Sequence, residues 1–392
     1  MDPIKNPFSP NAGAPPPALI GRDALIESFS VAARRIQAGR SQKSMLPTGL
    51  RGVGKTVLLN RFVDEARGLG YVVAQLEASE SETFLETVAT EIRNALYSLS
   101  SSAKVRGALN RALGVLKGFT LTLGLTDLSL KLGVDTLPGK GDSGILSSDL
   151  TALFVAVGEA AREENSAVLI AIDELQYLNE EQLAAIIMAV HRVAQLGLPL
   201  LVIGTGLPQL PALAGNAKSY AERLFDYPSV GPLSRLEVFE AIRGPADAEG
   251  VAITDTALDR LHTITEGYPY FIQEWAYRVW NIALRSPISI DDVSAAEPEV
   301  LARLDESFFR VRYDRLTPRE KQYLRAMAEL GPGPHRSGDI ANILGVKVES
   351  SSPLRSGLIK KGMIYSPQHG DTAFTVPLFD AFMRRTMPLR AT

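Results

Sequence analysis

The chain has 392 residues, of which 45% are apolar and 22% are charged, and this composition is typical of a globular protein with roughly two or three domains. It contains no cysteine, which excludes a disulfide framework, a thiolate metal site and a cysteine nucleophile. No apolar run of about eighteen residues and no basic-then-apolar leader occur, so we expect a cytoplasmic protein that does not contact the membrane. The four histidines lack metal-ligand spacing: His191, His262, His335 and His369.

The net charge of −3 conceals an uneven distribution. From Leu316 to the end there are 11 Lys and Arg against 6 Asp and Glu, a balance of +5. The rest of the chain has 30 against 38, a balance of −8. An acidic body followed by a basic segment predicts that an anionic partner binds at the C-terminal end.

The N-terminal segment, residues 1–18, is rich in Pro, Asn and Ala. Such a composition predicts an extended segment that runs over the surface. It is followed by L-I-G-R-D-A-L-I-E-S-F, in which an amphipathic helix begins near Asp23.

A glycine-rich loop lies between Thr48 and Asn60. Gly49, Gly54, Lys55 and Thr56 fit the pattern G-x-x-x-x-G-K-[ST]. In that pattern backbone N–H groups bind phosphate, the lysine reaches the β- and γ-phosphates, and the hydroxyl ligates Mg²⁺. A short apolar run precedes the loop and an apolar helical pattern follows it, as this motif requires; a glycine-rich turn without function is the alternative. The predicted ATP-binding residues are Gly49, Leu50, Arg51, Gly52, Val53, Gly54, Lys55, Thr56 and Val57.

A second informative stretch is A-V-L-I-A-I-D-E, residues 167–174. A continuous apolar run predicts a strand of a parallel sheet that is buried on both faces. Ligands bind at the carboxyl ends of such strands, and this one ends in Asp173 and Glu174. We therefore expect Asp173 to hold Mg²⁺ with Thr56, and Glu174 to orient or deprotonate the attacking water. The alternative is that Asp173 caps a helix.

A further parallel strand, residues 198–203, ends in Gly204-Thr205-Gly206. Thr205 either contacts the γ-phosphate or the water, or is an ordinary turn residue. Strands and helices alternate through residues 19–232, which predicts a three-layer α/β/α P-loop ATPase core. Within it, the alternation of apolar and polar residues over 119–134 predicts a β-hairpin insertion.

The C-terminal half is predicted to be a helical lid, residues 233–315, followed by a winged helix-turn-helix domain, residues 316–392. The last domain has three predicted helices and a two-stranded wing around His369. Its recognition helix offers short donors and cations that suit phosphates and base edges of double-stranded DNA, although many winged helices bind proteins instead. The predicted DNA contacts are Ser351, Arg355, Lys360 and Lys361.

Together, the loop G-L-R-G-V-G-K-T, the strand I-A-I-D-E-L and the N-terminal L-I-G-R-D-A-L-I-E resemble AAA+ ATPases of the origin-recognition and Cdc-six-like initiator type. The resemblance covers most of residues 18–392. It implies that Ile20 and Arg22 pack near adenine and that Thr205 is sensor one. It also implies that Arg223 completes the site of a neighbouring subunit, and hence a homo-oligomer or a partner protein.

One position departs from this family. Its second sensor arginine follows a Gly-x-Pro near the start of a lid helix, where this chain has Tyr270. A tyrosine cannot supply that positive charge. The Gly267-Tyr268-Pro269 stretch and the N-terminal G-R-D also resemble the STAND signalling ATPases, which act as slow nucleotide switches.

The sequence therefore predicts a nucleotide-dependent switch: an ATPase with slow turnover that uses ATP and Mg²⁺ and binds DNA through its winged helix. The alternative is a STAND-like switch with little turnover, whose winged helix mediates packing or protein contacts. A third interpretation, an ATPase that regulates a transposition or defence system, has the same chemistry and a different partner.

Overall fold

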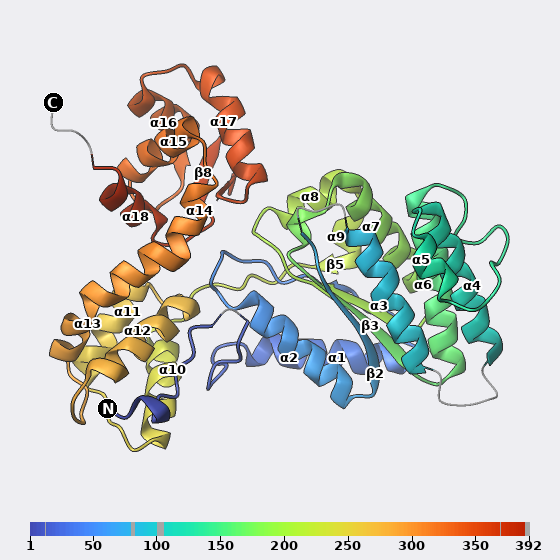
Figure 1. Cartoon of the computed structure of the whole chain (residues 1–392), viewed down its shortest axis with the longest axis horizontal. Helices are drawn as coiled ribbons and strands as arrows, with labels where there is room; N and C mark the ends of the chain where they lie inside the picture. Colours follow the sequence, from blue (N-terminus) through green and yellow to red (C-terminus); the bar gives the residue numbers. More distant parts are fainter. Residues whose placement is uncertain (12, 80–82, 100–105, 369, 389–392) are drawn as a thin grey trace. The chain divides into compact units, whose positions relative to one another are not determined.

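The computed structural model describes residues 1–11, 13–79, 83–99, 106–368 and 370–388 (Figure 1). The chain forms two compact units. Unit 1 comprises Met1–Gly21, Gly49–Gly54 and Val230–Thr392, and unit 2 comprises Arg22–Thr48 and Lys55–Ser229. The chain therefore passes between the units at four peptide bonds, of which three involve a glycine: Gly21, Gly49 and Gly54.

Unit 2 contains a parallel sheet. Its strands are β1 (Ser44–Met45), β2 (Tyr71–Glu77), β3 (Ala167–Asp173), β4 (Leu200–Gly204) and β5 (Phe225–Asp226). β3 pairs in parallel with β2 on one side and β4 on the other, and β1 pairs in parallel with β5. A parallel bridge between Thr48 and Gly206 joins the two groups, which gives the order β2-β3-β4-β1-β5.

Helices cover both faces of this sheet. Along β3, Val168, Ile170 and Ile172 belong to the apolar core shared with α3, α6 and α7, because alternate side chains of a strand point to opposite faces. On the other face lie α1 and α2, joined by stacked rings of Phe29 and Phe62 at 4.7 Å. The predicted three-layer arrangement is confirmed. The helices of unit 2 are α1 (Asp23–Gln37), α2 (Lys55–Gly68), α3 (Phe84–Leu99), α4 (Arg106–Thr122), α5 (Thr126–Leu130), α6 (Leu146–Glu163), η2 (Leu175–Tyr177), α7 (Glu180–Gln195), α8 (Leu210–Ala217) and α9 (Ala221–Leu224).

The predicted β-hairpin at 119–134 is wrong, because this segment is the end of α4 followed by α5. The apolar stripe of α4 begins before residue 119, and Ala112, Leu116 and Phe119 are buried at helical spacing. Threonine hydroxyls occupy the apparent polar positions of the alternation. They donate to carbonyls one turn earlier, Thr120 to Lys117 at 2.9 Å and Thr122 to Gly118 at 3.1 Å, so the helix satisfies them.

The central part of unit 1 is helical. It comprises α10 (Arg235–Ala248), α11 (Asp255–Thr265), α12 (Pro269–Ile282), α13 (Ile290–Arg303), the π-helical turn η3 (Leu304–Phe309) and α14 (Arg310–Asp314). Ser234 and Glu237 form a capping box at the start of α10. Trp275 and Trp280 of α12 are buried. This core continues into the C-terminal helices, so residues 233–315 and 316–388 share one apolar cluster.

The N-terminal segment was predicted to run extended over the surface. In the structure its first residues pack on α12 and contribute to the core of unit 1. It contains a short 3-10 helix, η1 (Pro3–Lys5). Phe8 is buried, with its ring 6.3 Å from that of Trp280. The Trp280 indole N–H donates to the Asp2 carbonyl at 2.9 Å, and the Asn6 amide donates to the Tyr277 carbonyl at 2.9 Å. Segment 1–11 is therefore an integral part of unit 1.

The C-terminal part of unit 1 groups helices beside a small sheet (Figure 1). The elements are α15 (Pro318–Glu329), β6 (His335–Arg336), α16 (Ser337–Leu344), α17 (Val348–Lys360), β7 (Ile364–Tyr365), β8 (Asp371–Phe374) and α18 (Phe379–Thr386). The sheet is antiparallel with the order β6-β8-β7, one strand more than predicted. His369 lies outside the described residues. Among the described helices, none combines the length and the apolar character needed to cross a membrane.

Candidate nucleotide site

Asp173, at the carboxyl end of β3, is the centre of a hydrogen-bonded cluster in unit 2. Its carboxylate accepts the Thr56 hydroxyl at 2.6 Å, where α2 begins, and also the hydroxyl of Thr205, which directly follows β4. The amide of Glu174 donates to the same carboxylate at 2.9 Å. Three residues that the sequence analysis singled out from separate segments, Thr56, Asp173 and Thr205, are thus brought together.

Glu174 is held by a residue that the sequence analysis missed. The Gln176 side-chain amide donates to the Glu174 carboxylate, and its carbonyl accepts the Leu207 amide at 3.0 Å. Glu174 itself has a left-handed backbone, with φ 56°. Such a conformation is uncommon for a residue with a side chain and is often found at functional sites. A glutamine two residues after the acidic pair was the available sequence signal.

Glu77 adds a third carboxylate to this edge of the sheet. It ends β2 and lies directly opposite Asp173 in the strand register. Burial, and then the charges of Asp173 and Glu174, raise the pKa of the Glu77 carboxyl above its ordinary value. Its position at the end of a buried parallel strand is the signal by which the sequence could have revealed it.

The glycine-rich loop Gly49–Gly54 is bound by residues of its own unit through two peptide groups. The Arg51 amide donates to the Thr375 carbonyl at 3.0 Å, and the Gly52 carbonyl accepts the Tyr270 amide at 3.1 Å. Gly52 and Gly54 have positive φ angles of 81° and 88°, which only glycine adopts without strain. At Gly49, a Cβ atom would lie 2.1 Å from the Val230 carbonyl oxygen, so no side chain fits there.

Tyr270 contacts the loop with its backbone, while its ring points into an aromatic cluster. The ring stacks on Phe308 with centroids 4.6 Å apart and meets Phe271 edge-on at 5.7 Å. Burial raises the pKa of the Tyr270 hydroxyl. The side chain is thereby occupied in packing, and it carries no positive charge.

The remaining predicted nucleotide-site residues lie on separate elements. Lys55, Thr56 and Val57 form the first turn of α2, and Lys55 is buried. Ile20 packs against the apolar core of unit 1, whereas Arg22 in unit 2 is the residue before α1. Arg223 is exposed on α9, and no hydrogen bond found among the described residues joins its side chain to the Asp173 cluster.

Three of the four predicted DNA contacts are engaged within the C-terminal part of unit 1. Ser351 is buried and donates to the Val348 carbonyl at 2.9 Å. Arg355 donates to the Thr372 hydroxyl at 2.9 Å, and its guanidinium also binds Ser366 and the Asp371 carbonyl. Lys361 forms an ion pair with Glu320 at 2.7 Å. Lys360 is exposed.

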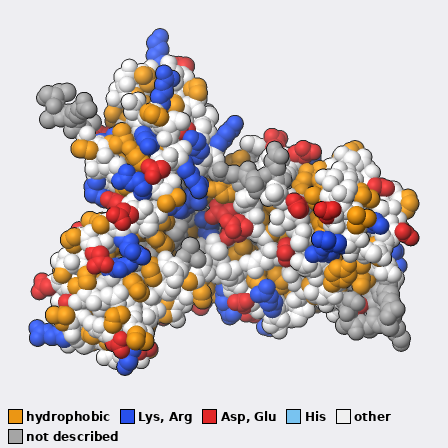
Figure 2. Space-filling view, viewed as in Figure 1, with side chains coloured by type: hydrophobic (Ala, Val, Ile, Leu, Met, Phe, Trp, Pro, Cys, Tyr) orange, Lys and Arg blue, Asp and Glu red, His pale blue; other side chains and the backbone are white. Residues whose placement is uncertain are grey.

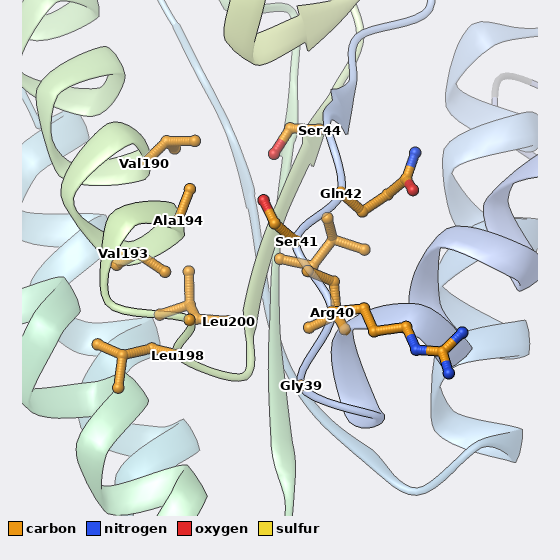
Figure 3. Close-up of a pocket in the computed structure, with 13 residues that line it drawn as sticks. Gly39, Arg40, Ser41, Gln42, Ser44, Val190, Val193, Ala194, Leu198 and Leu200 are labelled. Atoms are coloured by element: carbon orange, nitrogen blue, oxygen red, sulfur yellow. The ribbon is translucent and has the colours of Figure 1, made fainter.

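A hollow in unit 2 lies at the opposite ends of the strands from Asp173 (Figure 3). Apolar side chains of α7 and β4 form one wall, and residues 39–44 before and in β1 form the other. Ser44 and Leu200 are the first residues of their strands, whereas Asp173 is the last of β3. The hollow is therefore separate from the carboxylate cluster.

Two family models match the sequence. Residues 18–203 match an AAA ATPase domain, and residues 306–383 match a domain of unknown function. The first of these matches contains the glycine-rich loop, Asp173 and Glu174. No curated protein matches the sequence.

Solved structures agree with the fold. The Walker-type ATPase PABY2304 of Pyrococcus abyssi is 16% identical with a TM-score of 0.60, over 93% of this chain and 96% of that chain. The Aeropyrum pernix Orc1 protein in complex with DNA is 14% identical (TM-score 0.46; 94% and 93% covered). The Thermotoga maritima RuvB Holliday junction branch migration motor is 17% identical (TM-score 0.44; 90% and 92% covered). The first likeness shows the fold alone, and the other two are too weak to carry a conclusion.

Proposed function

We propose that this chain is a nucleotide-dependent switch that binds and slowly hydrolyses ATP and that binds DNA through a winged helix-turn-helix at residues 316–392. The observation that carries the proposal is the position of Asp173, which accepts hydroxyls from both Thr56 and Thr205 at the carboxyl end of the sheet. A phosphate-binding lysine, a metal-binding acid and a polar sensor are the groups that ATP hydrolysis requires there.

The residues present suit Mg²⁺. A hydroxyl and a carboxylate 2.6 Å apart are hard oxygen ligands, and Mg²⁺ commonly binds through one or two such groups together with substrate phosphates. Among the described residues, no group of three or more acidic or histidine side chains forms a complete metal cage, which agrees with a metal that is shared with the substrate. When bound, Mg²⁺ would neutralise negative charge on the phosphates.

The protein groups then have separate roles. Lys55 binds the β- and γ-phosphates, and Thr56 and Asp173 hold the metal. Glu174 orients the attacking water and accepts its proton, while Gln176 fixes the Glu174 carboxylate through its hydrogen bond. Thr205 positions Asp173. Ile20 and Arg22 are proposed to lie near adenine, as the family resemblance implies.

The loop contacts support slow turnover. The Arg51 amide and the Gly52 carbonyl bind the Thr375 carbonyl and the Tyr270 amide. Reorganisation of the loop around phosphate therefore changes its contacts with α12 and with the segment that follows β8. Since Tyr270 cannot provide a cation to the transition state, part of the electrostatic stabilisation typical of fast ATPases is missing.

The same loop contacts favour a second candidate, a STAND-like switch with little turnover whose winged helix mediates packing or protein contacts. Thr375 belongs to the C-terminal segment that would be the winged helix, and it already packs on the loop. Co-purified ADP and negligible Mg²⁺-dependent turnover would favour this candidate over the first.

The experiment that tests ATP hydrolysis compares three proteins. We expect Mg²⁺-dependent phosphate release by the wild type. Lys55→Ala should lose ATP binding, and Glu174→Gln should retain ATP binding but lose turnover. Equal turnover in the wild type and Glu174→Gln would contradict the role of Glu174. Duplex binding is measured separately, with the full chain at low ionic strength.

Arg223 tests the proposed assembly. An arginine that stabilises a neighbour's transition state is worth roughly 10³-fold or more in rate. Lys55→Ala and Arg223→Ala are each expected to be inactive alone. A mixture should recover activity, because one subunit can supply the nucleotide site and the other the arginine. Inactivity of the mixture would count against a shared site.

A further inference from the structure

The candidate recognition helix α17 is poorly suited to nucleic acid. Besides the engaged Ser351 and Arg355, its first turn carries the exposed carboxylate Glu349. Apolar side chains surround the turn before it: Ile343, Val346 and Val348 are 44%, 43% and 40% exposed. The exposed Lys347 before α17 balances the charge of Glu349, so this tip has no net positive charge to attract phosphates.

A different surface of unit 1 is strongly basic. Residues 310–321 contain five Lys and Arg against two Asp and Glu, a balance of +3. Four of these cations define what we call the basic edge: Arg310, Arg315, Arg319 and Lys321. Figure 2 shows Lys and Arg side chains gathered over the part of unit 1 that contains α14 and α15.

The charges of the basic edge are available. In the part of the chain that the structure describes, none of its four side chains forms an ion pair with a carboxylate within 4.0 Å, and three of the four residues are exposed. Two acids occur in the same stretch: the exposed Asp314, which among the described residues forms no ion pair within 4.0 Å with any of the four cations, and Glu320, which is buried and bonded to Lys361 at 2.7 Å. It therefore neutralises Lys361 and leaves the basic edge positive.

An aromatic ring lies close to two of these cations. The Lys321 ammonium is 3.9 Å from the centroid of the Tyr313 ring, and the Arg310 guanidinium carbon is 5.7 Å from it. The Tyr313 ring also meets Phe382 edge-on at 5.8 Å, which fixes its position. The ring thus holds two flexible cations near one another.

Helix stability does not explain these cations. Arg319 and Lys321 lie within the first turn or so of α15, near the positive end of the helix dipole. Cations in that position typically reduce helix stability. Clustered positive charge without carboxylate partners fits an anionic partner better.

We propose that the basic edge, and not α17, binds the phosphate backbone of the duplex DNA. This inference rests on the proposed function and assigns its DNA contacts to Arg310, Arg315, Arg319 and Lys321. Three of the four are arginines, whose planar guanidinium matches phosphate in a bidentate geometry. These contacts are to the backbone, so binding is strongly salt-dependent and largely independent of base sequence.

The test uses the full chain and a short fluorescein-labelled duplex of arbitrary sequence, with fluorescence anisotropy over a salt titration. Arg310→Gln/Arg319→Gln removes two charges from the basic edge. Lys347→Gln/Lys360→Gln removes two exposed charges from the edges of α17 and serves as the matched control. Circular dichroism and thermal unfolding establish that both variants are folded.

We expect the basic-edge variant to lose at least tenfold in affinity, and its log–log salt slope to fall by about 2, since each phosphate contact contributes about 0.9. The control should change little. An equal or greater loss in the control, or wild-type affinity in the basic-edge variant, overturns this proposal and leaves the proposed function intact. No duplex binding by the wild type overturns both DNA proposals. Displacement of duplex by poly-aspartate at equal charge concentration would show a general acidic partner instead, and overturn nucleic acid as the ligand.

Discussion

The backbone N–H of Arg51 donates to the backbone carbonyl of Thr375 at 3.0 Å. Arg51 lies in the loop that is proposed to bind phosphate, and Thr375 follows the last strand of the C-terminal sheet. Thr375 is itself fixed, because its amide donates to the Met363 carbonyl at 3.0 Å and its hydroxyl donates to the Gly362 carbonyl. A rigid acceptor from the C-terminal segment therefore occupies one donor of the loop.

This contact predicts that nucleotide changes hydrogen exchange in two distant segments. In nucleotide-free protein the Arg51 amide should be protected. Mg²⁺-ATP should alter protection in the loop and also around Thr375, because the loop reorganises around phosphate. Hydrogen exchange with mass spectrometry measures both peptides. Lys55→Ala should give the nucleotide-free pattern even with ATP. Unchanged exchange around Thr375 in wild-type protein saturated with ATP would contradict the switch.

A second prediction concerns the Thr205 hydroxyl. Thr205→Val keeps the shape of a fully buried side chain but removes its hydrogen bond to Asp173. A hydrogen bond to a charged group contributes roughly 1.5–3 kcal/mol, so ATP turnover should fall about tenfold or more while ATP affinity changes little. Steady-state phosphate release and nucleotide titration measure the two effects. Thr205→Ser should restore turnover; failure of serine to do so would point to packing as the cause.

The sequence predicted the acidic cluster because its signals are local. A continuous apolar run fixes β3 as a central strand, and the acids that follow it must lie at the edge where ligands bind. The loop pattern likewise fixes the position of Lys55 and Thr56 at the start of a helix. Topology then brings these residues together, so the meeting of Thr56 with Asp173 was foreseeable.

Other features left no such signal. The Arg51–Thr375 contact is a hydrogen bond between two backbone peptide groups that are far apart in the sequence. Because every residue has the same backbone groups, no residue type predicts such a contact. The helix α4 was mistaken for a strand because threonine alternates with leucine there, and a hydroxyl bonded back to its own helix resembles an outward polar position. The hydrogen bonds of Arg355 with Thr372 and of Lys361 with Glu320 also have no signal in the sequence.

A third prediction is a pH-dependent contribution from Glu320. Burial raises the pKa of this carboxyl, but the hydrogen bonds from Lys361 and Thr317 outweigh it and hold the pKa below its ordinary value of 4.5. The ionised Glu320 carboxylate therefore stabilises the fold fully above pH 4.5, and this stabilisation is lost as the pH falls through the folded-state pKa. Glu320→Gln should lower the free energy of unfolding by roughly 1–3 kcal/mol at pH 7.

Chemical denaturation across the acid range measures this contribution. The difference between wild type and Glu320→Gln should shrink as the pH falls below 4.5. Glu329→Gln is the control, since Glu329 pairs with Arg325 at a more exposed position and should contribute less. A difference that stays constant with pH would contradict the assignment.

A fourth prediction is that removing the Tyr227 hydroxyl stabilises the protein. This oxygen is buried, and it has no hydrogen-bond partner among the described residues. Burial raises the pKa of Tyr227 to about 12. Tyr227→Phe should raise the free energy of unfolding by about 1 kcal/mol, because an unpaired buried polar group is costly. Tyr71→Phe should have the opposite effect, since the Tyr71 hydroxyl donates to the Ala33 carbonyl at 2.6 Å. Thermal unfolding measures both changes in stability. A change of the same sign in the two variants would refute this prediction.

Two of the four peptide bonds that join the units bracket the loop Gly49–Gly54. Glycine at both ends of the loop permits wide torsion ranges there. Closing the loop around phosphate would restrict these torsions and reduce the backbone entropy of the loop. The free energy of nucleotide binding would therefore include the ordering of the same six residues through which the chain leaves and re-enters unit 2.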